Sequence, residues 1–225
     1  MKNKNFDQQF KVEKKSYLDK LDFIDWTRYF YMFKTIISDE PKSILEFGTG
    51  SDIMRSCAEP FVENYTTVDL NEKLKPDIFG DVREFHKDLE FQYDIIIAAD
   101  ILEHIPFNDL QGTIKNFYQY LKPKGKCLIT IPHRRSNFLY MTPRQNLSFF
   151  HVPTGFLSFG SFYRRFIKRK IWIDDNHCWE IGDGNIKVKD VNECFLKNKF
   201  VISNYSKLFY VDYWVLSKSK ENNSN

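Results

Sequence analysis

Short apolar runs alternate with helix-like segments between residues 43 and 131, and this alternation constrains the fold more than any other feature of the chain. Such a pattern predicts a parallel sheet with helices on both faces. The run YDIIIAA at 93–99 is almost wholly apolar, as is typical of a central parallel strand covered on both sides. We expect strands at 43–47, 65–69, 77–81, 93–99 and 126–131, and helices at 52–60 and 108–121.

The segments on either side complete this expected domain, which we take to span residues 1–225 as a single unit. Residues 6–40 read as an N-terminal helical cover. Its apolar stripe is formed by Trp26, Tyr29, Phe30, Phe33 and Ile37. Near the other end, we expect a helix at 189–198 and a closing antiparallel pair of strands at 200–209 and 211–216. The predicted fold class is therefore α/β, with a Rossmann-like, mostly parallel sheet and a C-terminal antiparallel strand pair.

Residues 133–176 differ in character from the rest of the chain. Eight Lys and Arg residues stand here against two acids, which gives this stretch a net charge of +6, while the whole chain carries only +3. Ten aromatic residues accompany them. We interpret this stretch as an inserted basic and aromatic lid, which borders the acceptor of whatever reaction the domain performs.

Cysteine usage and the N-terminus bear on the environment of the protein. The four cysteines contain no CxxC pair, so we predict no metal site and reduced thiols. The N-terminal residues are polar and lack the apolar core of a signal peptide, and no apolar run approaches the length of about 20 residues that a membrane span needs. These features favour a cytoplasmic protein, and a net charge of +3 is too small to argue for nucleic acid.

Acidic residues follow three successive predicted strands. Glu46 ends the first strand, directly before Gly48 and Gly50, and Asp69 and Asp81 end the next two. Glycines permit a sharp turn close to a ligand, and an acid 19 residues after the second glycine suits ribose hydroxyls. An acid beside the glycines favours a ligand with a cationic amino group over a pyrophosphate. S-adenosylmethionine (SAM) carries an ammonium and a sulfonium and no phosphate.

The successive motifs ILEFGTG, VDL, GDVREF, YDIIIAADILEHIP and LKPKGKCLITIP resemble those of class I SAM-dependent methyltransferases. The resemblance covers residues 41–132 closely and 177–216 more loosely. It implies that the glycine loop surrounds the methionine part of SAM and that Asp69 holds the ribose. It also implies that Leu70 lies against the adenine, that Asp81 and Val82 meet the adenine edge, and that Asp100 borders the methionine carboxylate and amine. In one departure, Asp52 stands where family members often have a third glycine. The implied cofactor-binding residues are Glu46, Phe47, Gly48, Thr49, Gly50, Asp69, Leu70, Asp81, Val82 and Asp100.

Three residues are candidates for catalysis: His177, Glu180 and His133. His177 and Glu180 lie just after the insertion and can act as a base and its orienter, since accepting a proton makes a hydroxyl a better nucleophile. The alternative is that they form a polar pin that docks the segment onto the sheet. His133 follows the fifth strand, where it can face the acceptor. We expect His104 to have a structural role rather than a catalytic one.

The predicted reaction is transfer of the SAM methyl group to an oxygen or nitrogen of a small acceptor, with an anionic or glycan-related compound such as a sugar or sugar nucleotide as one class. The segment HCWEIG at 177–182 resembles methyltransferases of surface-glycan clusters, which supports that class. Two alternatives remain. One is methylation of a lipid-like or quinone precursor at the membrane, with peripheral contact through 156–172. The other is a catalytically inactive SAM-binding partner subunit.

Overall fold

A computed structural model describes residues 11–133, 135–143, 147–153, 159–168, 174, 176–182 and 186–219. Its main sheet has seven strands in the order β3-β2-β1-β4-β5-β9-β8. Strands β3, β2, β1, β4 and β5 pair in parallel, and β9 runs antiparallel to both of its neighbours. The predicted fold class is therefore confirmed. The strands are β1 (Ser43–Phe47), β2 (Asn64–Asp69), β3 (Ile78–Phe79), β4 (Tyr93–Ala99), β5 (Leu121–Pro132), β8 (Phe200–Lys207) and β9 (Val211–Lys218).

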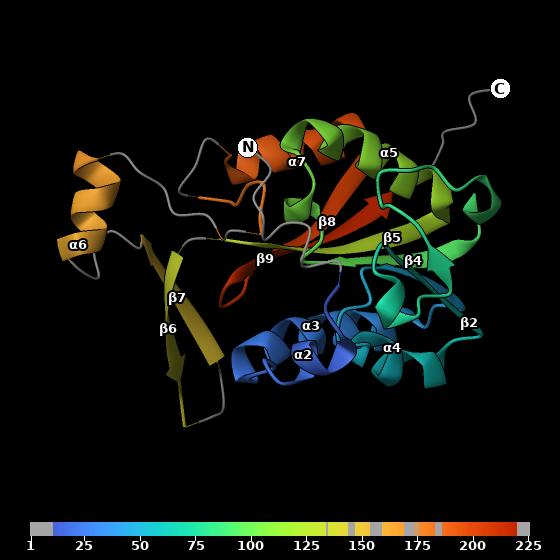
Figure 1. The fold of residues 1–225 in the computed structure, drawn as a ribbon, viewed down its shortest axis with the longest axis horizontal. Helices are drawn as coiled ribbons and strands as arrows, with labels where there is room; N and C mark the ends of the chain where they lie inside the picture. Colours follow the sequence, from blue (N-terminus) through green and yellow to red (C-terminus); the bar gives the residue numbers. More distant parts are fainter. Residues whose placement is uncertain are drawn as a thin grey trace.

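Helices cover both faces of this sheet (Figure 1). On one face lie α2 (Lys14–Leu18), α3 (Phe23–Asp39) and α4 (Ile53–Ala58), and on the other lie α5 (Leu110–Tyr120) and α7 (Val188–Lys197). Strand β4 shows why its sequence is a continuous apolar run. Ile95 and Ile97 pack with the core on the α3 side, and Ile96 and Ala98 pack with the core on the α5 side. Successive side chains of a strand point to opposite faces, and here both faces are buried.

Helices α2 and α3 form the N-terminal segment, and only part of the predicted stripe, Tyr29 and Phe33, packs against the core. Trp26, Phe30 and Ile37 are 43%, 55% and 40% exposed. Met32 and Ile36 are instead fully buried against the sheet. Helix α3 carries apolar residues on more than one side, so its sequence period does not identify the side that packs. Residues 6–10 of the predicted cover lie outside the described residues.

Two strand boundaries also differ from the sequence prediction. Strand β3 is only Ile78–Phe79, and the Gly80 amide that follows donates the last bond of its pairing with β2, to the Asp69 carbonyl. Strand β5 begins at Leu121, which pairs with Tyr93, ahead of the turn that Pro123 and Gly125 suggested. The register then shifts between Tyr93 and Ile95, which lets one strand contain both the irregular stretch and the regular one.

The predicted insertion contains a second, two-stranded sheet. Strands β6 (Arg135–Met141) and β7 (Leu147–Pro153) pair antiparallel with each other and with no strand of the main sheet. Helix α6 (Phe159–Phe162) continues into a π-helical turn, Tyr163–Ile167. Figure 1 shows the hairpin and α6 projecting to one side of the main sheet. Within the described ranges of the chain, no helix is long and apolar enough to cross a membrane.

Candidate active site

The loop after β1 has a backbone shape that requires glycine at Gly48. This residue has a φ of 78°, and a Cβ built on it would lie 1.9 Å from Cδ1 of Ile101. Gly50 also has a positive φ, 47°, and its Cβ position is open apart from Tyr17 at 3.9 Å. Asp52 keeps the left-handed conformation, with a φ of 64°, although its side chain is not that of glycine. The departure from the family motif therefore preserves the path of the loop.

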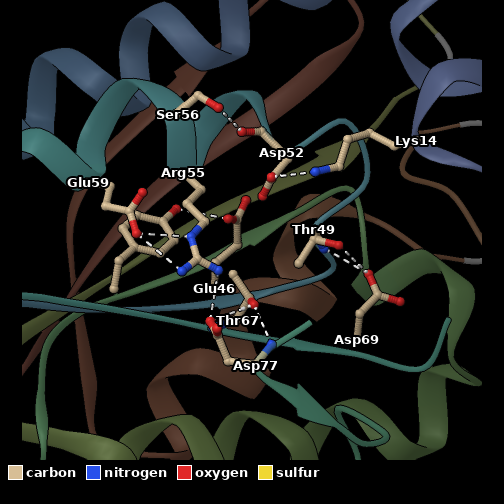
Figure 2. A network of polar contacts seen from close by, with 11 residues as sticks. Lys14, Glu46, Thr49, Asp52, Arg55, Ser56, Glu59, Thr67, Asp69 and Asp77 are labelled. Atoms are coloured by element: carbon tan, nitrogen blue, oxygen red, sulfur yellow. Dashed lines mark hydrogen bonds and ion pairs between the residues drawn. The ribbon is translucent and has the colours of Figure 1, made fainter. Parts of the chain in front are cut away.

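Asp69 lies at the end of β2, as the sequence predicts, and its carboxylate also bonds to the glycine loop. Its Oδ2 accepts bonds from the Thr49 amide at 2.8 Å and the Thr49 hydroxyl at 3.2 Å. Its Oδ1 accepts a bond from the Asn71 amide at 2.8 Å. Figure 2 shows Thr49 and Asp69 facing each other beside the glycine loop. Leu70, half-buried, follows directly. Each carboxylate oxygen has two lone pairs, so Asp69 retains acceptor capacity for a ligand hydroxyl.

The N-terminal segment closes over the same loop, a feature that sequence reasoning missed. Lys14 Nζ lies 2.6 Å from Asp52 Oδ2, and Figure 2 shows this pair above the loop. The Asn71 side-chain amide donates a bond to the Val12 carbonyl at 2.7 Å. The predicted cofactor loop therefore has helix α2 as a cover. No local motif in residues 12–17 reveals this contact, because it depends on tertiary packing.

Asp100 lies at the end of β4, where the sequence places it, and three other elements hold it. Its Oδ2 accepts bonds from Arg28 of α3 and from the Tyr210 hydroxyl at 3.1 Å. Its Oδ1 accepts a bond from the Thr130 hydroxyl of β5 at 2.6 Å. Arg28 is largely buried, and it also bonds to Tyr29 at 3.0 Å. Arg28 and Tyr210 were missed because they lie far from Asp100 in sequence.

Glu46 lies deeper than the predicted contact with an ammonium group suggests. The Tyr65 hydroxyl donates to its Oε2 at 2.8 Å, and the side chain is buried. Burial raises the pKa of Glu46 to about 8, and the nearby Asp52 and Asp69 carboxylates also raise it. Glu46 is therefore part of the floor beneath the loop. Phe47, its neighbour, points to the opposite face and stacks on Phe117.

Asp81, at the predicted adenine edge, is held by a residue that was not singled out from the sequence. Arg83 Nε and Nη2 contact its carboxylate at 3.0 and 2.5 Å. These hydrogen bonds hold the pKa of Asp81 below its usual value. Val82 packs against the core on the α5 side. The adenine contacts of Asp81 and Val82 stay a prediction.

The segment around His177 and Glu180 docks onto the turn that follows β4. The Cys178 amide donates to the Glu103 carbonyl at 2.7 Å, and the Trp179 indole donates to the Ile105 carbonyl at 3.0 Å. His177 Nδ1 lies 2.7 Å from Glu180 Oε1, which also accepts a bond from the Asp174 amide at 3.0 Å. Glu180 thus orients the ring and fixes the segment, so it combines the geometry of both predicted roles.

His133 lies apart from that pair in its contacts. Its amide donates to the Tyr210 carbonyl at 2.8 Å, and its Nε2 lies 3.2 Å from the Leu208 carbonyl oxygen. It also forms an isolated parallel bridge with Ile181. The side chain is buried. This geometry fixes the exit of β5 against the β8–β9 turn, and a catalytic role for His133 stays a prediction.

Comparison with known proteins places this architecture in a family. A model described as a methyltransferase domain matches residues 28–188, more than half of the chain. A search of curated proteins found no match.

Several solved structures share the fold at low sequence identity. The N-methyltransferase NodS from Bradyrhizobium japonicum WM9, in complex with S-adenosylhomocysteine (SAH), gives a TM-score of 0.64 at 11% identity and covers 97% of this chain and 99% of its own. The 1,6-didemethyltoxoflavin-N1-methyltransferase of Burkholderia thailandensis gives 0.57 at 14% identity, with 92% and 85% covered. A SAM-dependent methyltransferase from Clostridium acetobutylicum ATCC 824 gives 0.56 at 13% identity, with 89% and 93% covered.

The family match agrees with the glycine loop and with the acids at the ends of β2 and β4. The predicted family, the class I SAM-dependent methyltransferases, and the predicted cofactor, SAM, are confirmed. The chain therefore belongs to the methyltransferase-domain family and is a class I SAM-dependent methyltransferase.

Proposed function

We propose that this enzyme transfers the SAM methyl group to a nitrogen or oxygen of a small acceptor. Polar groups gather at the carboxyl ends of β1, β2 and β4, where ligands bind in open α/β sheets, and they support this proposal. Asp69 offers acceptors for ribose hydroxyls. Arg28 and Asp100 place opposite charges side by side. The methionine end of SAM is a zwitterion, and this pair complements both of its charges.

Two structural neighbours support the acceptor class. NodS is an N-methyltransferase, and the Burkholderia enzyme holds 1,6-didemethyltoxoflavin, a small molecule, together with SAH. A small acceptor, with a sugar or sugar nucleotide as one class, fits an enzyme in which the insertion at 133–176 borders the acceptor. In this proposal most of the rate enhancement comes from positioning the acceptor in line with the methyl group.

We propose that His177 helps to activate the acceptor for methyl transfer. Glu180 accepts a bond from Nδ1 of its ring, so Nδ1 carries the proton and Nε2 carries the lone pair. Nε2 can then accept a proton from the acceptor. Alternatively, it can bind a metal ion that lowers the acceptor's pKa.

A second acceptor class is favoured by the surface of the insertion. Large apolar side chains are exposed along it, and they are Phe138, Leu139, Tyr140, Met141, Phe150, Phe159, Phe162, Tyr163, Phe166 and Ile167. Lys168 lies over the Tyr163 ring at 5.5 Å. A basic and aromatic surface of this kind suits peripheral contact with a membrane and hence a lipid-like acceptor. Of the segment 156–172, residues 156–158 and 169–172 lie outside the described residues. Sedimentation with anionic vesicles tests this class, and absence of the protein from the vesicle pellet counts against it.

Calorimetry tests the cofactor site. Asp69→Ala is expected to weaken SAM binding by about 1–3 kcal/mol, the scale of hydrogen bonds to a charged group. Asp88→Ala is the matched control, because Asp88 is an exposed aspartate outside the site. Equal SAM affinity in the two variants would contradict the role of Asp69.

Formation of SAH tests turnover. The wild-type enzyme is incubated with SAM and separate panels of small amines, nitrogen heterocycles, sugars and sugar nucleotides. Production of SAH with one panel identifies the acceptor class. SAM binding without SAH from any panel or from lipid vesicles would instead favour the inactive partner subunit.

A further inference from the structure

Two histidines and a buried carboxylate meet beside the proposed acceptor site. Glu103 and His104 belong to the short turn after β4, and His177 belongs to the docked segment. One ligand atom from each residue lies within 4.8 Å of the other two. His177 Nε2 is 4.0 Å from Glu103 Oε1, and the two imidazole rings lie 4.9 Å apart in an edge-to-face arrangement.

Both histidines present a lone pair on a defined nitrogen. His104 Nδ1 lies 2.9 Å from the Asn176 carbonyl oxygen, which can only accept a hydrogen bond. Glu180 accepts in the same way from Nδ1 of His177. In its neutral form each ring therefore carries its proton on Nδ1 and its lone pair on Nε2. Carbonyl and carboxylate partners of this kind orient histidines that bind metals.

Glu103 lies near the charge of Arg28 and 4.0 Å from His177 Nε2, without a hydrogen bond to either. Its side chain is fully buried, and neither carboxylate oxygen has a hydrogen-bond partner in another residue of the described chain. A buried polar group without a partner is costly, and a cation held between these side chains would offset that cost.

We propose that Glu103, His104 and His177 bind one divalent transition-metal ion. Two imidazoles and a carboxylate suit zinc, cobalt, manganese or iron rather than magnesium or calcium, which prefer all-oxygen sites. Ligand atoms about 2.0–2.2 Å from a common ion lie at most about 4.4 Å apart, so small side-chain rotations close the set. The two histidines are only half-buried, which leaves coordination positions open on their side. The prediction of no metal site was based on cysteine spacing, so it concerned thiolate ligands alone.

The role of this ion in catalysis rests on the proposed methyl transfer, whereas its binding does not. A hydroxyl acceptor that coordinates the ion has a lowered pKa and releases its proton to solvent. The acceptor oxygen then bonds to the methyl carbon while the carbon–sulfur bond breaks. The electron pair of that bond stays on sulfur, which yields neutral SAH. His177 acts here as a ligand rather than as the base.

Titration with Co²⁺ tests the site by spectroscopy, without SAM or any acceptor. The full chain is first treated with a chelator, and all proteins carry Cys178→Ser so that this exposed thiol does not contribute. We expect one equivalent of Co²⁺ to produce ligand-field bands and Zn²⁺ to displace it, while excess Mg²⁺ does not. Glu103→Gln and His177→Gln should each weaken Co²⁺ binding at least tenfold. His86→Gln, which removes a histidine outside the cluster, should leave it unchanged.

Thermal melting and SAM affinity show whether each variant is folded. Glu103 is buried, so if Glu103→Gln does not fold, the half-buried His177→Gln carries the test. Absence of Co²⁺ and Zn²⁺ binding by the parent protein would overturn the proposal, as would equal binding by folded His177→Gln. Methyl transfer that persists in the chelated enzyme and is lost in His177→Gln would overturn the catalytic role of the ion, and would leave the proposed function standing with His177 as the base.

Discussion

At the scale of single residues, the cofactor end of the molecule contains unusual backbone. Gly48, Asp52 and Asp100 all have positive φ, and they lie at the ends of β1 and β4 or in the adjoining loop. A non-glycine residue in this region costs about 1 kcal/mol or more unless its surroundings hold it there. Lys14 holds Asp52, and Arg28 holds Asp100. The site thus depends on contacts from the N-terminal helices as well as on the sheet.

Glu46 gives a prediction for the pH dependence of stability. Its pKa is raised from 4.5 to about 8 in the folded protein, mainly by burial. The folded state therefore keeps a proton that the unfolded state loses above about pH 4.5, and the free energy of unfolding falls as pH rises toward 8. One such group contributes a slope of at most about 1.4 kcal/mol per pH unit. Glu46→Gln cannot titrate and should have a shallower slope.

Urea unfolding at several pH values between about 5 and 8, without SAM, measures this slope. Tyr65, Asp52, Asp69 and Arg55 face Glu46 and are the same in both proteins. Glu63→Gln, at an exposed surface pair with Lys42, is the control and should keep the parent slope. Parallel curves for the parent and Glu46→Gln would show that Glu46 is already ionised in the folded state.

At the scale of elements, what the sequence predicted follows the strength of each local signal. Strand β4 was predicted at its observed boundaries because an apolar run buried on both faces is unambiguous. The predicted apolar stripe of helix α3 was only partly right, because Tyr29 and Phe33 pack against the core. Trp26 and Phe30 are as apolar as the buried Met32 but are exposed, and only packing distinguishes them. Strand β3 was overestimated, because two paired residues leave little pattern to detect.

Gly48 in the loop and Gly112 in helix α5 should respond oppositely to substitution by alanine. Gly48→Ala should lower the melting temperature and weaken SAM binding, because its φ is positive and the new Cβ would overlap Ile101. Gly112→Ala lies in α5, where nothing lies within 4 Å of the new Cβ, and alanine is favoured in helices by about 1 kcal/mol. It should raise the melting temperature. Thermal melting with and without SAM measures both, and a loss of stability in Gly112→Ala would refute the comparison.

At the scale of the whole molecule, the predicted and the missed parts of the site differ in how far apart their members lie in sequence. The glycine loop, Asp69 and Asp100 each follow a strand, so local patterns reveal them. Arg28 and Tyr210 reach Asp100 from opposite ends of the chain. Glu103 was passed over because a glutamate within a turn gives no sign of burial in a single sequence. Such residues are found only once the fold brings their elements together.

The insertion at 133–176 should be separable from the cofactor site. In the described part of the chain, its strands β6 and β7 pair with each other and with no other strand, and none of the proposed SAM contacts lies within it. Replacing residues 138–170 with a short Gly/Ser linker should therefore leave SAM affinity near wild type by calorimetry while methyl transfer, measured as SAH, is lost. Loss of SAM binding as well would mean that the segment supports the cofactor site. A double variant, Phe138→Ser with Met141→Ser, keeps the segment and removes two exposed apolar side chains, so it tests the same role if the deletion does not fold. Undiminished transfer in the folded deletion would show that the acceptor binds elsewhere, because a segment that borders the acceptor cannot be removed without displacing it.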